Sequence, residues 1–529
     1  MRKHLLTVVF VLAALAVVAA ACSPAATASP APLPAPATGV PSATHAAPTA
    51  RPTAQPTSPP APTAAATVAF NATDAEEEGY WYSRYNLGNL VMRSALGDTF
   101  APDKAAIKRM IQMVDTSPDD GDTAKPPLHV ALLQSVYASG DPHYIKPFNP
   151  DDFETQRWDP ATFDKTVTSR ALGWTMTKES EWAKQFHVDF HFGTPEDKFG
   201  AQWRFVGMIL NAESKMQAQY ALTHLKNEQG LIANSDGKVD WTGQWVMLEA
   251  FSDLAGTVRP AVLPHSKTNR YHDEAAAKKF QGAADALFQA LNGRQPADSE
   301  EASLAIQGLT WYAANTAHAT SKAQAITMIG QFGDLLAAAQ PASAAGDAAV
   351  IRGLIEAYRV TGTERYLKAA ADHAARLAAS FDTAHGVFTN QDTYTIDDIA
   401  TIMGALNSLK LFAGDAVDQK EVESIFTRFY ESAVNQSGLQ QSAPPIPVAK
   451  GKFEQGEPKI FYTYPGIPVP PKAGGKFGIA PVFAAAIHWD GAHWSVADGR
   501  FDTAGAMHAS NEFIWFHNDE VNGFPNVGQ

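Results

Sequence analysis

The chain has 529 residues, of which 45% are hydrophobic and 18% are charged. This composition supplies ample material for a large core and excludes a wholly disordered or collagen-like chain. The net charge of −14 argues against nucleic acid as the main partner, and a single cysteine excludes a disulfide framework, a cysteine zinc site and haem attachment.

The N-terminus has the pattern of a bacterial lipoprotein signal peptide. Arg2-Lys3 is followed by apolar and small residues from 5 to 21, a stretch that is short for a membrane-spanning helix. It ends at Ala21-Cys22-Ser23, which resembles the lipobox of bacterial lipoproteins. We therefore expect residues 1–21 to be removed and Cys22 to carry a lipid anchor, which holds the chain on the extracytoplasmic side of the cell envelope. The alternative is a plain secretory signal with an incidental cysteine.

Residues 22–67 are expected to form a disordered tether that begins at the lipidated Cys22. From 23 to 67 the chain has 12 prolines and one Lys or Arg, Arg51, and consists otherwise mainly of Ala, Thr and Ser. Such a segment cannot bury enough apolar surface to offset the entropy of ordering, so it stays extended. The folded domain is therefore expected to span 68–529.

Helical periodicity dominates from residue 68 onward. The clearest unit begins at residue 348, where an apolar face ends at Gly362 and a second helix follows from 364 to 381. A longer loop then leads to a third helix that begins at 397. The same alternation predicts further helices at 272–291, 299–317, 322–339 and 418–436, and less regular ones within 102–139 and 199–256.

A short motif repeats within the domain. Gly-x-x-x-Asn-x-Asp at 230–236 recurs at 386–392, and each copy precedes an apolar helix. We interpret this as an internal repeat, although Gly, Asn and Asp also populate turns for local reasons. Near the C-terminus, residues 482–496 predict a β-hairpin that turns at Asp490-Gly491, and residues 502–516 predict a final helix.

The hairpin rhythm, the segment Thr361–Ala370, and the loop with Asp382, Gly386 and Phe388 resemble the six-hairpin glycosidase superfamily. The resemblance is close over 270–436 and loose elsewhere. It implies an all-α fold, an (α/α) toroid of about six to seven helical hairpins with one small C-terminal β-hairpin. Toroids of this kind include hydrolases, lyases, epimerases and non-catalytic proteins, so the fold alone does not define the activity.

Ligands of such toroids usually lie where the long loops gather and the inner helices begin. Glycoside cleavage needs two carboxylates about 5–10 Å apart and aromatic planes that stack on sugar rings. We expect Asp240 with Asp397 or Asp398 to be the catalytic pair. The expected substrate-binding residues are Trp241, Trp245, Tyr394, Asn234 and Asn390. The competing interpretation is that each acid only caps its own helix.

Several further patterns have an ordinary structural explanation. His187, Asp189 and His191 alternate as on one face of a strand, and His488 and His493 flank the predicted hairpin turn. Either set could bind a divalent metal such as zinc, but a half-buried strand and a surface hairpin account for both patterns, so we assign no metal and no cofactor.

Two other segments are weighed in the same way. Glu512 lies among apolar neighbours, where a buried carboxyl could act as a general acid, but a hydrogen bond to another helix also explains it. The aromatic segment 79–86, with Arg84, could line a carbohydrate cleft, but packing of an N-terminal segment onto the first helix is the more ordinary explanation.

The sequence thus predicts a surface-anchored carbohydrate-active lipoprotein, most simply a glycoside hydrolase that uses a pair of carboxylates. One alternative is a non-catalytic ligand-binding or scaffold lipoprotein on the same fold, and another is a polysaccharide lyase or epimerase. No phosphate-binding, dinucleotide-binding, zinc-protease or serine-hydrolase motif is found in the sequence. The expected partners are the membrane, through the lipid, and a carbohydrate ligand.

Overall fold

The computed structural model describes residues 69–114, 132–146, 155–187, 200–259, 269–441 and 482–513. Residues 1–67 and 68–529 are two separate units. The expected signal peptide, Cys22 and the tether lie outside the described residues and stay predictions. Within the described ranges, no helix combines the length and the apolar character needed to cross a membrane.

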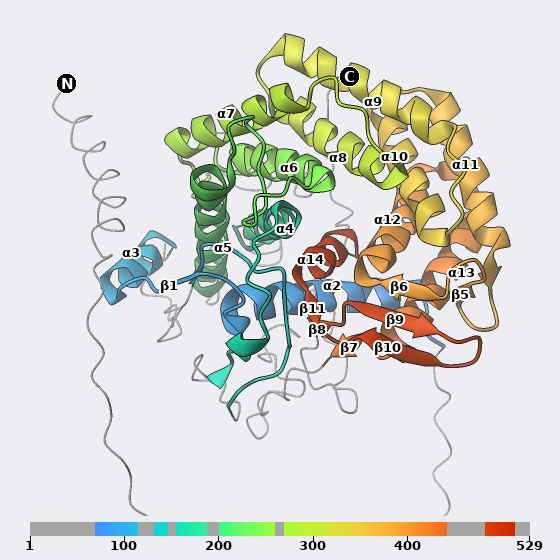
Figure 1. Cartoon of the computed structure of the whole chain (residues 1–529), viewed down its shortest axis with the longest axis horizontal. Coiled ribbons are helices and arrows are strands. Elements are labelled where there is room, and N and C mark those ends of the chain that lie inside the picture. The colour runs from blue at the N-terminus through green and yellow to red at the C-terminus, as the bar shows by residue number, and fades with distance from the viewer. Residues whose placement is uncertain are drawn as a thin grey trace, which may run out of the picture. The chain divides into compact units, whose positions relative to one another are not determined.

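Six of the described helices form a closed inner ring (Figure 1). These are α4 (Ser169–His187), α6 (Trp241–Thr257), α8 (Ser299–Asn315), α10 (Ala344–Thr361), α12 (Ile396–Phe412) and α14 (Thr503–Glu512). Each packs against the next in this order, and α14 packs against α4, which closes the ring. The ring is therefore complete without any strand between its helices.

Each inner helix has an outer partner from the set α5 (Gly200–Tyr220), α7 (Glu274–Leu291), α9 (Ala319–Ala337), α11 (Glu364–Ala379), α13 (Gln419–Phe429) and α2 (Ala72–Asn89). Short π-helical turns extend α2, α5 and α13, at Leu90–Ser94, Ala221–Leu225 and Tyr430–Gln436. A smaller helix, α3 (Lys104–Val114), packs on α5. Six inner and six outer helices among the described residues define an (α/α) toroid, which confirms the predicted fold class; five of the pairs are consecutive hairpins, and α14 with α2 is the sixth pair.

Inner and outer helices differ in how their buried residues are distributed around the helix. In α12, every residue from Ile399 to Leu409 except Thr401 is buried, because this helix touches two ring neighbours and an outer helix. In α13, only Val422, Ile425, Phe426 and Phe429 are buried, which is one stripe at helical spacing. A one-sided stripe suffices for an outer helix because its other side faces solvent.

Close packing inside the ring depends on small residues. A Cβ built on Gly308 of α8 would lie 2.4 Å from the backbone oxygen of Trp245 on α6, so any side chain there would push the two helices apart.

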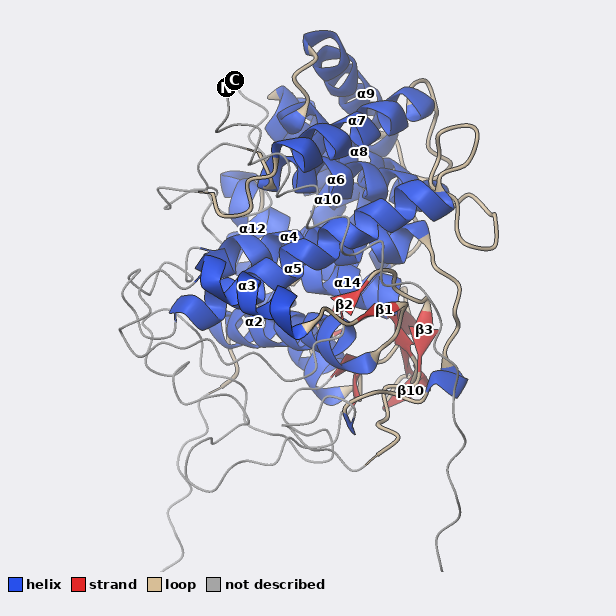
Figure 2. Ribbon diagram, turned by 90° about the vertical axis from the view of Figure 1, so that its left-hand side faces the viewer, coloured by secondary structure: helices blue, strands red, loops and turns tan. Residues whose placement is uncertain are grey.

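The side view in Figure 2 shows helices forming most of the body, with the strands gathered on one part of it.

Segments from opposite ends of the chain close the ring. The first helix, α2, packs in the outer layer against α14, the last helix described. The Ser83 hydroxyl donates a 2.8 Å hydrogen bond to the backbone oxygen of Ser510, across 427 positions of sequence. The aromatic segment 79–86 lies within α2, and its Tyr80, Trp81, Tyr82 and Tyr85 are buried, so the packing interpretation of this segment is correct.

The strands are short and connect the hairpins. The two-residue strands are β1 (Thr99–Phe100), β2 (Leu132–Leu133), β3 (Ser139–Gly140), β4 (Phe381–Asp382), β5 (Val387–Phe388), β7 (Gln440–Gln441), β8 (Val482–Phe483) and β11 (Phe501–Asp502). The longest sheet has the order β10 (Trp494–Asp498), β9 (Ala486–Trp489) and β6 (Thr393–Thr395), all antiparallel. This sheet joins the loop before α12 to the predicted C-terminal hairpin.

Two local predictions are corrected. The β-hairpin is present, but Trp494 pairs with Trp489, so the connection has four residues instead of the predicted two-residue Asp490-Gly491 turn. His488 therefore pairs with Ser495, and His493 lies in the connection. His187 ends a helix, not a strand, while Asp189 and His191 lie outside the described residues.

Candidate active site

The first turns of the inner helices gather at one end of the ring and form a charged cluster. Arg170, Glu300 and Asp397 lie in the first turns of α4, α8 and α12, and His508 comes from α14. We call these four residues the mouth cluster. It joins side chains from four of the six inner helices.

Arg170 holds two carboxylates of the mouth cluster. Its Nη2 atom lies 2.7 Å from Oδ2 of Asp397 and 2.7 Å from Oε1 of Glu300. The two carboxylate oxygens are therefore no farther apart than twice that distance. A cation in the first turn of a helix opposes the helix dipole, so these two anions supply the compensation that Arg170 needs there.

Asp397 is held in its ionised form. Burial alone would raise the pKa of this carboxyl, but the charges of Arg170 and His508 and their hydrogen bonds hold the pKa well below its usual range. Its Oδ1 atom lies 2.7 Å from Nδ1 of His508, and the imidazole stacks on Trp174 of α4 with the ring centroids 4.6 Å apart. Asp397 thus fixes the orientation of His508 and stays negative at neutral pH.

Asp240 lies beside the mouth cluster, before the first residue of α6. Its side chain makes no capping hydrogen bond to that helix, and its Oδ1 atom accepts a 2.7 Å hydrogen bond from the Thr242 hydroxyl. The negative charge of Asp240 acts on Arg170 together with those of Asp397 and Glu300. The structure therefore places Asp240 and Asp397, which the sequence analysis predicted as a catalytic pair, around the same guanidinium group.

Asp398 has a different role from the one expected. It forms a capping box with Thr395: the Thr395 hydroxyl accepts from the Asp398 N–H, and the Asp398 carboxylate accepts from the Thr395 N–H at 2.9 Å. Burial raises the pKa of this carboxyl. The capping interpretation therefore describes Asp398 better than the catalytic one.

The predicted aromatic platforms divide into one exposed ring and two buried rings. Trp241 is 37% exposed, and the guanidinium carbon of Arg294 lies 3.7 Å from its ring centroid. Trp245 is fully buried and donates from Nε1 to Glu301. Tyr394 is also fully buried, and its hydroxyl bonds to the backbone of Phe388. Trp245 and Tyr394 are core residues with no exposed face for a sugar, which corrects that part of the expectation.

The two predicted asparagines bind backbone groups. Oδ1 of Asn234 accepts the backbone N–H of Ser169 at 3.0 Å, and so supports the start of α4 next to Arg170. Asn390 is exposed and donates to the backbone oxygen of Ala342 at 3.3 Å. Asn234 therefore contacts the start of α4 beside the mouth cluster, whereas Asn390 bonds to the segment before α10.

Glu512 lies inside the ring and is paired. It is 4% exposed, and its Oε2 atom lies 3.4 Å from Nε of Arg352 on α10. Arg352 also contacts Glu356, and Glu356 contacts Arg359 at 2.7 Å. Glu512 is therefore a buried glutamate bonded to another helix, which is the ordinary explanation given for it from the sequence.

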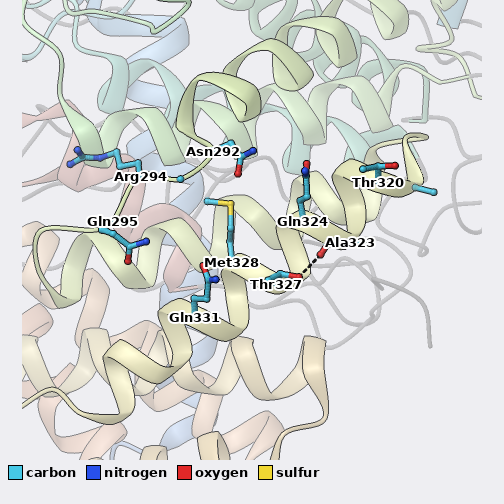
Figure 3. A pocket seen from close by; sticks show the side chains of 11 residues that line it. Asn292, Arg294, Gln295, Thr320, Ala323, Gln324, Thr327, Met328 and Gln331 are labelled. Atoms are coloured by element: carbon cyan, nitrogen blue, oxygen red, sulfur yellow. Dashed lines mark hydrogen bonds between the residues drawn. The ribbon is translucent and has the colours of Figure 1, made fainter.

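A surface hollow of about 710 Å³ lies between the segment after α7 and the part of α9 from Ala319 to Gln331 (Figure 3). Its polar lining consists of amide and hydroxyl side chains and one charged residue, Arg294: Asn292, Arg294, Gln295, Thr320, Gln324, Thr327 and Gln331. Arg294 also binds both carboxylate oxygens of Glu301 and stacks on Trp241. Arg294 therefore both lines the hollow and stacks on the exposed ring of Trp241.

Sequence reasoning missed Arg170, Trp174 and the role of His508. One signal for Arg170 was available, because a cation in the first turn of an apolar helix is unfavourable unless anions compensate it. The partners of Arg170 are 130 and 227 positions away in sequence, so their identity required the fold. No group of three or more His, Cys, Asp or Glu side chains suited to a metal occurs in the described part of the chain.

Comparisons with known proteins give only distant structural similarity. The sequence matches no protein-family model and no curated protein. The structure is similar to an endoglucanase from the termite Nasutitermes takasagoensis, with a TM-score of 0.41, 10% identity, and coverage of 84% of this chain and 98% of that chain. It is also similar to endoglucanase CelQ from Clostridium thermocellum in complex with cellotriose, with a TM-score of 0.34, 12% identity, and coverage of 84% and 70%. Both TM-scores are below 0.5, so neither activity is carried over to this chain.

Proposed function

We propose that this chain is a carbohydrate-active protein, most simply a glycoside hydrolase that acts at the mouth of the toroid. The observation that carries the proposal is the gathering of three carboxylates, Asp240, Glu300 and Asp397, around Arg170 at one end of the ring. Hydrolysis of a glycosidic bond uses one ionised carboxylate and one carboxyl that donates a proton. Asp397 fits the ionised role because Arg170 and His508 keep its pKa low.

Asp240 is our proton-donor candidate. It is only partly buried, and its side chain is free of the capping bond that occupies Asp398. Glu300, whose side chain is 46% exposed, is the other carboxylate within reach of Arg170. Arg294 covers one face of the Trp241 ring, and the part of this ring that stays exposed supplies the aromatic surface on which a sugar ring can stack.

The test uses the full chain with a panel of neutral and acidic oligosaccharides and chromatography of the products. D240N and D397N should each lower kcat by about 10²–10⁴-fold, because an amide cannot exchange a proton or carry the negative charge. D236N is the matched control, since Asp236 lies four residues before Asp240, is exposed and pairs with Lys238. Wild-type activity that D240N leaves intact would show that the donor is another residue.

A binding protein is the second candidate, and the surface hollow favours it. Amides and hydroxyls line the hollow, and Arg294 connects it to the exposed Trp241 ring. Such groups bind sugar hydroxyls without any chemistry. Calorimetry that detects oligosaccharide binding, with no product after prolonged incubation, would support this function and exclude hydrolysis. An unsaturated product would instead indicate a lyase.

We also propose that the protein is anchored outside the cytoplasm through Cys22, which rests on the lipobox-like sequence alone. Expression of the full chain and of C22A, followed by separation of membrane and soluble fractions, tests this proposal. Wild type should be in the membrane fraction and incorporate labelled fatty acid, and C22A should do neither. Equal partition of the two proteins would contradict lipidation.

A further inference from the structure

Two buried carboxyl groups face the same packing layer between α4 and α5. Glu179 of α4 and Glu213 of α5 are both 0% exposed. Oε1 of Glu213 accepts the backbone N–H of Leu133 at 2.8 Å, and Oε1 of Glu179 accepts Nε2 of Gln217 at 2.8 Å. The second oxygen of each carboxyl has no hydrogen-bond partner among the described residues.

Gln217 adds a third buried oxygen to this group. It lies one helical turn after Glu213 and is also 0% exposed. Its Nε2 atom donates to Glu179 and lies 3.5 Å from the backbone oxygen of Leu133, which fixes the orientation of the amide. Its Oε1 atom, on the same amide carbon, has no donor within the described ranges. Three unpartnered oxygen atoms therefore come from one buried cluster.

The cluster lacks a positive charge. No Lys or Arg of the described chain pairs with Glu179 or Glu213, and the neighbouring Lys178 is bound to Glu181 at 2.5 Å. Burial raises the pKa of both carboxyls well above the usual value, and the charge of Glu213 raises that of Glu179 further. Two ionised carboxylates without a counter-charge are costly in such a place, so a cation is needed when both are ionised.

We propose that Glu179, Glu213 and Gln217 bind a divalent cation of the hard, oxygen-binding class, such as Ca²⁺ or Mg²⁺. Carboxylate and amide oxygens are the ligands that these ions prefer, and the cluster contains no His or Cys, which softer metals favour. The ion would fasten α4 to α5 and, through Leu133, to β2. This site is independent of the mouth cluster and of the proposed function.

The test combines metal analysis with thermal unfolding of the full chain. Protein treated with a chelator is measured alone and with millimolar Ca²⁺, Mg²⁺ or Mn²⁺, alongside E179Q, E213Q and E228Q. The glutamines keep one acceptor oxygen and nearly the same volume, and exposed Glu228 is the control because it is a surface carboxylate near the end of the same hairpin. E179Q and E213Q should fold because each removes a buried negative charge.

We expect one ion to raise the Tm of wild type and E228Q by about 3–5 °C at an ion concentration near 100 times Kd. Elemental analysis should then find about one equivalent bound to both proteins. E179Q and E213Q should lose the Tm shift and the bound ion. A wild-type Tm that no ion changes would overturn the site, since the two carboxyls would then share protons. A shift that E213Q retains would place the ion elsewhere and also overturn it.

Discussion

Arg170 and Asp397 form an ion pair of 2.7 Å between the first turns of two inner helices that are 227 positions apart in sequence. The pair joins α4 and α12, the two inner helices that flank α14 in the ring. Its side chains are only 18% and 24% exposed, so solvent screens the attraction less than at an open surface. This contact therefore affects both stability and the charge of the candidate site.

Replacing Arg170 should destabilise the fold more than replacing a surface arginine. R170Q leaves Asp397 and Glu300 without their shared cation, so we expect the free energy of unfolding to fall by about 2–4 kcal/mol. R365Q is the control, because the Arg365–Asp334 pair is 63% and 54% exposed and should cost under about 1 kcal/mol. Urea unfolding of both variants checks this, and equal losses would contradict a structural role for Arg170.

The stabilising effect of Asp397 should depend on pH. Because its folded pKa lies below its unfolded value, its contribution is complete above about pH 4–5 and is lost as the pH falls toward the folded pKa. D397N should therefore differ most from wild type near pH 7, and the difference should begin to shrink below about pH 4 and go on shrinking as the pH falls toward the folded pKa. The exposed Asp372 pairs with Lys368 on α11, and D372N should follow the wild-type curve at every pH.

Glu78 should have the opposite pH dependence. Burial raises its pKa to about 7, although Asn435 donates a 2.6 Å hydrogen bond to it. The stability that its protonated form provides is present below about pH 4 and is lost as the pH rises through 7. E78Q should therefore be more stable than wild type at pH 8 by about 2–3 kcal/mol and close to it at pH 4. E423Q, at an exposed position of α13, should show no such difference.

Two glycine substitutions should have opposite signs. G308A places a Cβ within 2.4 Å of the Trp245 backbone oxygen, so it should cost about 1–3 kcal/mol or more. G282A lies in α7 with no atom within 4 Å of the new Cβ, and alanine is the better helix former. G282A should therefore raise the free energy of unfolding by about 0.5–1 kcal/mol. A loss in both variants would mean that α7 is packed more closely than the structure shows.

The helices could be predicted because their pattern is local. The expected helix at 272–291 is α7, which begins two residues later, and the expected helix at 299–317 is α8. Gly362 ends α10 with a φ of 65°, as its position after the apolar face indicated. Such signals involve residues within a few turns of one another, so they are readable before the tertiary structure is known.

The site was only partly predictable, because burial inside the ring cannot be read from periodicity. Trp241 and Trp245 are four residues apart on one inner helix, yet the first is 37% exposed and the second is fully buried. From Gly243 onward nearly every position of α6 is buried, polar residues included, so the sequence does not distinguish the exposed first turn from the buried turns that follow. Asp397 and Asp398 differ in the same way, since only the fold shows which one meets Arg170.

The pairing of α2 with α14 makes the order of synthesis matter. Among the described helices, α2 is synthesised first and its ring partner α14 last, and the hydrogen bond from Ser83 to Ser510 spans 427 positions. A chain that emerges from the N-terminus can form its successive hairpins, but the ring stays open until α14 is available. Closure is thus a late, long-range event, for which slow folding is expected. Because α2 and α14 are adjacent, a circular permutant should keep the ring closed. In such a variant the present ends are joined by a linker and new termini are opened in another surface loop.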